Sequence, residues 1–245
     1  MTETTIALVT GANKGIGLAV VRRLAELGWT VLLGSRDAAR GAAAVSGLGG
    51  LDGGFRGGLD VRCVELDVTS ETSVQTAAKH VDDQFGRLDV LVNNAGIIGP
   101  RTPVLDVGAD ELRETYETNV FGPVRMMRAF VPLLRRSAAP RVVMVSSGMG
   151  SIAITSDPER VESTIIGLGY PSSKTALNMI TTQYAKALPG FRVNAADPGY
   201  TATDLNGHRG VQTVAEGSDA IVSLATVAPD GPTGGFFDRH GPVPW

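Results

Sequence analysis

The sequence feature that most constrains the fold is TGANKGIG at residues 10–17, which follows a short apolar run and precedes a segment with helical spacing. In that segment Ile16, Val20 and Leu24 recur at every fourth position, so one face of the expected helix is apolar. A strand, a glycine turn and a helix in this order bind phosphate, because unpaired N–H groups and the positive end of the helix dipole attract anions. Glycine also lets a ligand approach the backbone closely. The spacing G-x-x-x-G-x-G, in place of the commoner G-x-G-x-x-G, indicates a site for the pyrophosphate of a dinucleotide when later motifs support it.

Strand-like and helix-like segments alternate along the rest of the chain. Apolar runs typical of strands occur at residues 6–9, 30–33, 60–66, 88–92, 141–145, 191–196 and 234–237. Helical patterns follow the glycine turn and occur at residues 38–46, from Thr69 or Ser70 to Phe85, at 106–127, from Tyr170 onward, and at 211–226. This order predicts an α/β fold, a single-domain Rossmann-type doubly wound parallel β-sheet of about seven strands with helices on both faces. No internal repeat or linker divides residues 1–245, so we expect one dinucleotide-binding and catalytic domain.

The composition excludes several classes of protein. Hydrophobic residues make up 43% of the 245 residues and the net charge is −3, so nucleic acid and anionic membranes are poor candidates for partners. The apolar runs are too short to span a membrane, and the N-terminus lacks the features of a signal peptide. Cys63 is the only cysteine, which excludes an internal disulfide, and we expect it to be buried packing in a cytoplasmic protein. The three histidines are scattered without ligand spacing, so we expect no metal site.

Two stretches do not fit the alternation. Residues 47–58 hold seven glycines in twelve residues, which predicts a mobile surface connection. Residues 148–169 are irregular, with scattered apolar positions.

The end of the second strand bears on the choice of cofactor. An acid at this place senses a free ribose 2′-hydroxyl, whereas a cation suits a 2′-phosphate. Arg36 lies there, and Lys14 of the glycine turn also suits a phosphate. Asp37 is the competing interpretation, although its position favours capping of the next helix. We therefore expect NADP(H) to be the preferred cofactor and NAD(H) the alternative.

Polar or small residues follow several strands, at the edge where ligands collect in such sheets. Asp67 and Val68 follow the third strand, residues 93–96 (NNAG) the fourth, Ser147 the fifth and residues 197–203 the sixth. Taken alone, residues 93–96 would be interpreted as an Asx turn. Asn119 lies inside a helical pattern, where asparagine is usually solvent-facing or bonded to its own backbone.

Tyr170 and Lys174 are four residues apart and share one face of a helix. A fixed ammonium favours the phenolate, so we expect Lys174 to lower the pKa of Tyr170 and make it an acid and base near neutrality. Ser147 could hold a carbonyl oxygen by a hydrogen bond. The alternative is a chance pair on a surface helix. Only four of the 22 basic residues are lysines, and two of them, Lys14 and Lys174, occupy motif positions, which favours the functional interpretation.

In this order along one chain, these motifs resemble the short-chain dehydrogenase/reductase family, and within it the NADPH-dependent carbonyl reductase branch. The resemblance implies hydride transfer between nicotinamide C4 and the carbon of a small carbonyl or alcohol substrate. The apolar residues around 149–168, with Leu205, indicate a hydrophobic carbonyl compound, and the alternative is that they belong to the core. It implies that Tyr170 is the acid and base, that Ser147 orients the substrate oxygen, and that Lys174 lowers the tyrosine pKa and binds the nicotinamide ribose. Asn119 would hold a proton-relay water.

The resemblance also implies which residues contact the cofactor. Asp67 and Val68 would contact adenine, Asn94, Ala95 and Gly96 the adenosine side, and Gly199, Thr201 and Thr203 the nicotinamide amide. The full set of expected cofactor-binding residues is Gly11, Asn13, Lys14, Gly15, Ile16, Gly17, Arg36, Asp67, Val68, Asn94, Ala95, Gly96, Tyr170, Lys174, Gly199, Thr201 and Thr203.

Two departures from the family pattern remove no catalytic group, but the first of them leaves the substrate pocket and the oligomeric state, monomer or homo-oligomer, open. Ser147 and Tyr170 are 23 residues apart, between the compact members and the long-insert carbonyl reductases, and Pro171 follows the tyrosine. One alternative function is a redox sensor that binds the dinucleotide without turnover, although such proteins typically lack the tyrosine or the lysine. Another is a sugar-nucleotide epimerase or dehydratase, which usually needs a larger substrate domain than the roughly 70 residues after Lys174 provide.

Overall fold

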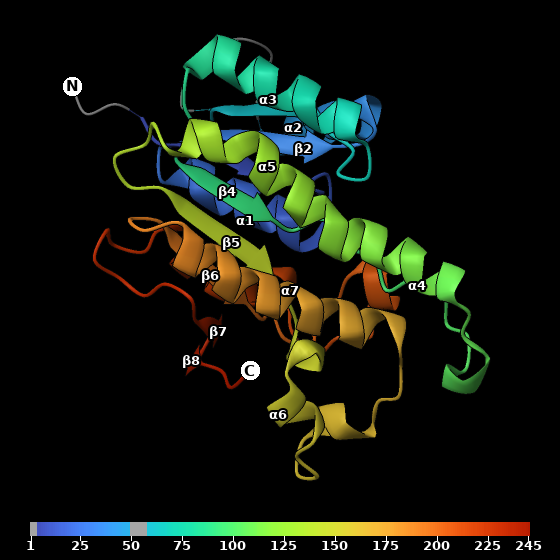
Figure 1. Cartoon of the computed structure of the whole chain (residues 1–245). Coiled ribbons are helices and arrows are strands. Elements are labelled where there is room, and N and C mark those ends of the chain that lie inside the picture. The colour runs from blue at the N-terminus through green and yellow to red at the C-terminus, as the bar shows by residue number, and fades with distance from the viewer. Residues whose placement is uncertain (1–3, 50–57) are drawn as a thin grey trace.

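Residues 6–9 form the strand β1 (Ile6–Val9), and all four are buried, as expected of a strand that helices cover on both faces. The computed structural model describes residues 4–49 and 58–245. Within them a twisted sheet is flanked by helices on both faces (Figure 1), so the predicted α/β fold with a doubly wound sheet is confirmed.

The strands form one sheet in the order β3-β2-β1-β4-β5-β6-β7-β8. After β1 they are β2 (Thr30–Ser35), β3 (Val61–Glu65), β4 (Val90–Asn93), β5 (Arg141–Val145), β6 (Arg192–Ala196), β7 (Phe236–Asp238) and β8 (Gly241–Pro242). Neighbours from β3 to β7 are parallel, and β8 is antiparallel to β7. The described residues thus hold one strand more than the predicted seven, because the chain turns back after Asp238 into a two-residue strand. The strand order reverses between β1 and β4, where sheets of this kind bind ligands.

The helices lie on both faces of the sheet. They are α1 (Gly15–Glu26), α2 (Ala38–Gly47), α3 (Glu71–Phe85), α4 (Ala109–Tyr116), α5 (Gly122–Leu134), α6 (Ile152–Thr155), α7 (Gly169–Ala187), α8 (Val214–Gly217) and α9 (Asp219–Ala225). Shorter helical turns are η1 (Val104–Asp106), η2 (Glu117–Phe121), η3 (Gly148–Gly150), η4 (Val161–Thr164) and η5 (Asp204–Asn206). In Figure 1, α3, α5 and α7 cover the near face of the sheet and α1 lies behind it.

Each face of the sheet has its own apolar core, because successive residues of a strand point to opposite faces. On β1, Ile6 and Leu8 belong to the core shared with α3, α5 and α7, whereas Ala7 and Val9 belong to the core shared with α1 and α9. The first core contains Phe130 of α5, whose side chain has no exposed surface.

Helix α3 begins and ends where the sequence predicts. The Ser70 hydroxyl accepts a hydrogen bond from the N–H of Ser73 and caps the first turn, and Gly86 ends the helix with φ of 70°.

Two helical predictions were too simple. The continuous helix expected at 106–127 is instead η1, α4, a π-helical turn at η2 and α5, which ends at Leu134. The final helix expected at 211–226 begins after its N-cap Thr213 and is interrupted at Ser218 between α8 and α9. Apolar spacing fixes the side that packs, but it does not show where the backbone changes pitch.

The two irregular stretches have different outcomes. Residues 148–169 contain η3, α6 and η4, so the segment is a small lobe of short turns. The mobile connection predicted at residues 47–58 falls largely on residues 50–57, outside the described residues, and Gly47 itself is the last residue of α2. Cys63, expected to be buried packing, is half-buried, and a Cβ added to Gly41 would lie 2.3 Å from its Sγ, so the thiol packs tightly against α2. Burial raises the pKa of the Cys63 thiol.

In residues 4–49 and 58–245, no helix is long and apolar enough to cross a membrane. The same residues contain no group of three or more His, Cys, Asp or Glu side chains that could hold a metal ion.

We expect Phe130→Ala to lower the free energy of unfolding by about 3–5 kcal/mol, because it removes a fully buried ring and leaves a cavity between α5 and the sheet. Denaturant unfolding measures this change. Met179 on α7 is 61% exposed, so the control Met179→Ala should stay within about 0.5 kcal/mol of the wild type. Equal losses in the two variants would contradict the assignment of Phe130 to the core.

Candidate active site

A cavity of about 800 Å³ opens at the carboxyl edge of the sheet, around the point where the strand order reverses. Most of the predicted cofactor-binding residues line it: Gly11, Asn13, Lys14, Gly15, Ile16, Gly17, Arg36, Asp67, Val68, Asn94, Ala95, Gly96, Tyr170, Lys174 and Thr203. They come from the connections after five different strands and from α7, so the topology brings together segments that are far apart in the sequence.

The glycine turn between β1 and α1 has no room for side chains at two of its glycines. Gly11 has φ of 61°, and a Cβ added to it would lie 2.9 Å from the Cα of Ala95. A Cβ on Gly17 would lie 2.5 Å from Nδ2 of Asn94. No side chain caps α1, so the N–H groups of its first turn are available to an anion from the cavity. This donor set and the bare backbone fit the pyrophosphate of a dinucleotide.

Asn94 holds the glycine turn in place. Its Nδ2 donates to the carbonyl oxygens of Thr10 at 2.8 Å and Gly11 at 3.2 Å. The Thr10 hydroxyl in turn accepts from the backbone N–H groups of Asn94 and Ala95, at 3.0 and 2.9 Å. The local Asx turn weighed for residues 93–96 is therefore not what Asn94 forms, because these partners lie more than 80 residues away in the chain.

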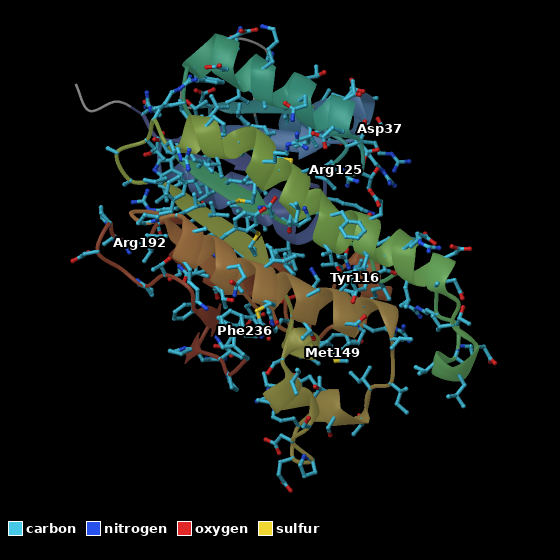
Figure 2. The ribbon with its side chains drawn as sticks, in the orientation of Figure 1. Asp37, Tyr116, Arg125, Met149, Arg192 and Phe236 are labelled. Atoms are coloured by element: carbon cyan, nitrogen blue, oxygen red, sulfur yellow. The ribbon has the colours of Figure 1, made fainter. Side chains whose placement is uncertain are left out.

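The groups at the adenosine end of the cavity differ in their availability. Asp37 accepts a hydrogen bond from the N–H of Arg40 and caps α2, which confirms the capping prediction (Asp37 is labelled in Figure 2). Arg36 is exposed and forms no ion pair with any other described residue. Lys14 instead donates to Oδ2 of Asp204 at 2.7 Å, a contact that links the glycine turn to η5.

The sequence analysis missed Asp204 and His208. The Nε2 atom of His208 lies 2.8 Å from Oδ1 of Asp204. The hydrogen bonds from Lys14 and His208 lower the pKa of the Asp204 carboxyl. The spacing of four residues between Asp204 and His208 is a signal that the sequence offers, but the pairing with Lys14 joins residues 190 positions apart.

Tyr170 and Lys174 lie one turn apart near the start of α7, as predicted. Lys174 is 4% exposed, and its Nζ donates to the carbonyl oxygen of Val145, the last residue of β5, at 2.7 Å. The Nζ also lies 5.6 Å from the centre of the Tyr170 ring. The turn after β5 packs closely here, since a Cβ added to Gly150 would lie 2.7 Å from Cβ of Lys174. These contacts exclude the alternative of a surface helix pair.

The predicted lowering of the Tyr170 pKa is wrong, because the pKa is raised. Although the side chain as a whole is only half-buried, desolvation of the hydroxyl raises the pKa of Tyr170 to about 12, and the negative charge of Asp197 acts in the same direction. A hydrogen bond with Ser147 opposes this rise in pKa. Burial lowers the pKa of Lys174 to about 8, against the raising effect of Asp197. Tyr170 is thus a protonated donor at neutral pH, beside a cation of reduced pKa.

Asn119 is neither solvent-facing nor bonded to its own helix. It is 1% exposed, its Oδ1 accepts from the N–H of Ile97 at 2.9 Å, and its Nδ2 donates to the Ile97 carbonyl at 2.9 Å and to Oγ of Ser173 at 3.0 Å. The residue lies in the π-helical turn η2, a distortion common at functional sites. A Cβ added to Gly96 would lie 3.4 Å from Oδ1 of Asn119 and 3.6 Å from Nζ of Lys174, so the two groups flank Gly96.

Four predicted residues lie off the cavity wall: Asn119, Ser147, Gly199 and Thr201. Ser147 nevertheless reaches Tyr170, and Asn119 reaches Gly96. Thr201 is 4% exposed, and its hydroxyl donates to the carbonyl oxygen of Pro198. It therefore stabilises the loop after β6 without lining the cavity. Of the three residues expected at the nicotinamide amide, only Thr203 is on the wall.

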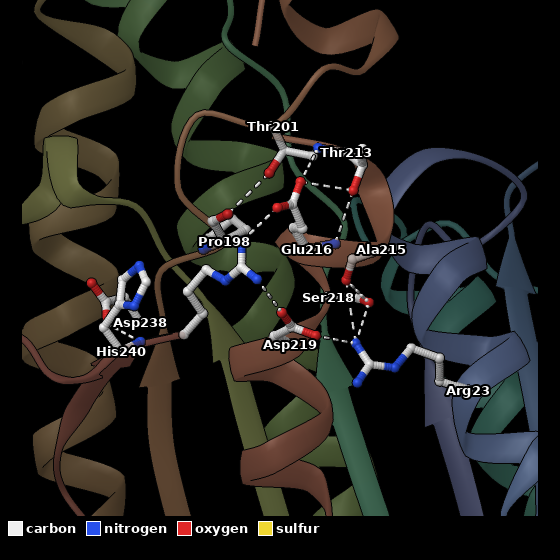
Figure 3. Close-up of polar contacts among 11 residues, drawn as sticks. Arg23, Pro198, Thr201, Thr213, Ala215, Glu216, Ser218, Asp219, Asp238 and His240 are labelled. Atoms are coloured by element: carbon white, nitrogen blue, oxygen red, sulfur yellow. Dashed lines mark hydrogen bonds and ion pairs between the residues drawn. The ribbon is translucent and has the colours of Figure 1, made fainter. Parts of the chain in front are cut away.

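A charged network holds the loop after β6 against α1 (Figure 3). Arg23 of α1 donates to Asp219 at 2.7 Å and to Oγ of Ser218 at 2.8 Å. Arg239 bridges Asp219 and Glu216, at 3.1 and 2.9 Å. Hydrogen bonds from Thr213 and Arg239 lower the pKa of the Glu216 carboxyl to about 2. The network joins α1, α8, α9 and the β7–β8 turn. It therefore fixes the side of the cavity that is lined by the segment after β6.

Comparisons with known proteins agree with this geometry. The model of a family described as short chain dehydrogenase matches residues 5–213. Among curated relatives, (+)-neomenthol dehydrogenase of Arabidopsis thaliana is 38% identical, with 95% of each chain covered. Salutaridine reductase of Papaver bracteatum is 31% identical, covering 97% of this chain and 95% of the relative. Among solved structures, NADPH-bound carbonyl reductase from chicken fatty liver matches with a TM-score of 0.85 and 28% identity, covering 99% of this chain and all of that chain.

We expect Asn119→Ala to lower the free energy of unfolding by about 1–3 kcal/mol, because the N–H and C=O groups of Ile97 lose their partners. Chemical denaturation tests this value. Thr182 bonds only within its own helix, so the control Thr182→Ala should change stability by less than about 0.5 kcal/mol. An Asn119→Ala variant as stable as the control would show that these hydrogen bonds contribute nothing.

Proposed function

The chain belongs to the short-chain dehydrogenase family, and from that premise we propose that it is an NADPH-dependent reductase that converts a ketone or aldehyde to an alcohol, or catalyses the reverse oxidation. The observation that carries the proposal is the convergence of Tyr170, Ser147 and Lys174 beside a cavity whose other end fits a dinucleotide. The retention of both Tyr170 and Lys174 supports turnover over a purely sensing role.

The residues of this site have separate roles in the proposed reaction. A nicotinamide cofactor bound in the cavity supplies the hydride for the carbonyl carbon. The Tyr170 hydroxyl donates its proton to the carbonyl oxygen, which its raised pKa allows because the phenol is protonated at neutral pH. Ser147, hydrogen-bonded with Tyr170, orients the same oxygen. Lys174 places a positive charge beside the phenol, and Asn119 holds the backbone at Ile97 next to it.

The preference for NADPH is supported by Arg36, which is exposed on the cavity wall without a competing carboxylate partner among the described residues. Asp37 is committed to capping α2 and is therefore not expected to accept from a free ribose hydroxyl. Lys14 must exchange Asp204 for a phosphate before it can contribute.

The class of substrate is a hydrophobic carbonyl compound. The lobe at residues 148–169 exposes apolar side chains, Ile152 at 65%, Ile165 at 53% and Ile166 at 86%, close in sequence to Tyr170. Leu205 lines the cavity and is 43% exposed. The relatives named neomenthol dehydrogenase and salutaridine reductase support a small-molecule carbonyl or alcohol as the substrate.

A screen of aldehydes and ketones, following NADPH absorbance, tests the proposal directly. Reduction of apolar ketones at rates well above the cofactor-only background is expected. No turnover with any carbonyl compound, in an enzyme that binds NADPH, would favour the sensing alternative.

We expect Tyr170→Phe to lower kcat by about 10²- to 10⁴-fold, the range that a general acid contributes, while the Kd for NADPH stays near that of the wild type. Steady-state rates and nucleotide fluorescence give the two values. Tyr184 is a half-buried tyrosine on the same helix, so Tyr184→Phe is the matched control and should retain kcat. Wild-type turnover in Tyr170→Phe would rule out this tyrosine as the proton donor.

We expect the ratio of kcat/KM for NADPH over NADH to fall about ten- to a hundredfold in Arg36→Ala, because a charge-assisted bond to the 2′-phosphate is lost. Asp204→Asn should raise the ratio, since it frees Lys14 to meet the phosphate. Arg40→Ala is the control, because Arg40 is also exposed but pairs with Asp37. A wild type that prefers NADH, or an unchanged ratio in Arg36→Ala, would contradict the phosphate site.

A further inference from the structure

Asp197 is a buried carboxylate next to the candidate active site that the roles described above do not use. It follows β6 directly and is 9% exposed. Its backbone N–H donates to the carbonyl oxygen of Phe237 on β7 at 2.8 Å, so the residue is fixed at the edge of the sheet. A carboxylate at this depth costs free energy unless hydrogen bonds satisfy it.

Two turns supply those hydrogen bonds. The N–H of Gly199 donates to Oδ1 of Asp197 at 2.9 Å, and the N–H of Gly148 also donates to the carboxylate. Gly148 follows Ser147. Gly199, with φ of 68°, lies in the loop after β6, which lines one side of the cavity. One side chain therefore joins the turn after β5 to the turn after β6.

The contact leaves no space between the two turns. A Cβ added to Gly148 would lie 3.0 Å from Oδ2 of Asp197 and 3.4 Å from Oε1 of Glu162. The turn after β5 is held from its other side by Asn178 of α7, which bonds Ser146 at 2.5 Å and the Gly150 carbonyl at 3.1 Å. Ser147 is thus positioned between two buried polar anchors.

The charge of Asp197 also reaches the residues proposed to move the proton. It raises the pKa of both Tyr170 and Lys174 on α7. The other charged groups that face Asp197 are Glu162 and Arg160 of the 148–169 lobe and Asp238 of β7. Burial raises the pKa of Asp197 most. The two backbone hydrogen bonds lower this pKa, and the negative charges of Asp238 and Glu162 raise it further.

We propose that Asp197 is a positioning residue of the reaction: its carboxylate holds the Ser147 turn and the Gly199 turn together beside Tyr170. The inference rests on the proposed function, since it assigns Asp197 a part in proton transfer to a carbonyl oxygen. Asp197→Asn is nearly isosteric and keeps an acceptor for one N–H group, but its amide N–H would face the second donor, so one turn must move.

Asp89 provides a matched control. It is also 9% exposed and accepts hydrogen bonds from the N–H of Ile6 at 2.8 Å and the hydroxyl of Ser137 at 2.5 Å, but it lies just before β4, at the opposite edge of the sheet. Asp89→Asn therefore measures what a buried carboxylate contributes to the fold alone.

We expect Asp197→Asn to lower kcat for carbonyl reduction about ten- to a hundredfold, as displacement of a positioned group does, with the KM for NADPH within about twofold of the wild type. Asp89→Asn should retain kcat. In the Ser147→Ala background the effect of Asp197→Asn should largely disappear, because the two residues act through the same group. Additive losses in this cycle, or wild-type kcat in Asp197→Asn, would overturn the proposal.

The pH profile separates positioning from a general loss of stability. Removal of the negative charge should lower the pKa of Tyr170 and Lys174, so the alkaline limb of kcat/KM for the carbonyl substrate should move to lower pH in Asp197→Asn and stay in place in Asp89→Asn. An unmoved limb in Asp197→Asn, or an equal shift in both variants, counts against the proposal. If Asp197→Asn does not fold, Gly148→Ala disturbs the same contact from the other turn and should give the same fall in kcat.

A readout without turnover distinguishes the two proposals. The Kd for NADPH, followed by nucleotide fluorescence, should rise with pH as Lys174 loses its proton, and this rise should begin at lower pH in Asp197→Asn than in the wild type or Asp89→Asn. If no carbonyl compound is reduced but this shift occurs, the proposed function fails and the link from Asp197 to the site stands. If carbonyls are reduced and neither pH curve moves, only the role of Asp197 fails.

Discussion

The hydrogen bond from the buried ammonium of Lys174 to the end of β5 is the interaction on which the rest of the site depends. A charge that is 4% exposed costs free energy, and here it is offset by a 2.7 Å hydrogen bond to the last carbonyl of β5 and by the negative charge of Asp197. Because the bond joins α7 to the end of a central strand, it sets the height of Tyr170 above the sheet edge. Gly150 must be small for the same reason, since Lys174 occupies the space of a side chain there.

Local patterns in the sequence predicted most of the fold. The apolar run of β1, the caps at Ser70 and Asp37 and the glycine turn before α1 depend on residues close together in the chain, so their spacing is sufficient to identify them. The spacing of Tyr170 and Lys174 on one helix face is of the same kind. The positions where the backbone changes pitch, at η2 and at Ser218, leave no mark in that spacing.

Long-range pairings account for what could not be predicted. Lys14 has a phosphate-binding position by motif, but its partner Asp204 lies 190 residues away. Asn119 is buried because the backbone N–H and C=O groups of Ile97, in the loop after β4, both need partners, and this need arises only when the elements pack. The pKa of Tyr170 depends on desolvation and on Asp197, which follows β6, so the sign of its shift could not follow from the nearby lysine alone.

The raised pKa of Tyr170 determines the stage of the proposed reaction at which Lys174 acts. With a pKa of about 12, Tyr170 keeps its proton until the carbonyl oxygen gains negative charge, and an alkoxide is a stronger base than a phenolate. Transfer then leaves a phenolate in a desolvated place, where an unpaired charge is costly. The Nζ of Lys174, 5.6 Å from the ring centre, favours that charged product more than the resting phenol. Lys174 is therefore better understood as stabilising the state after proton transfer than as ionising Tyr170 beforehand, and burial of both groups strengthens their interaction because water screens it little.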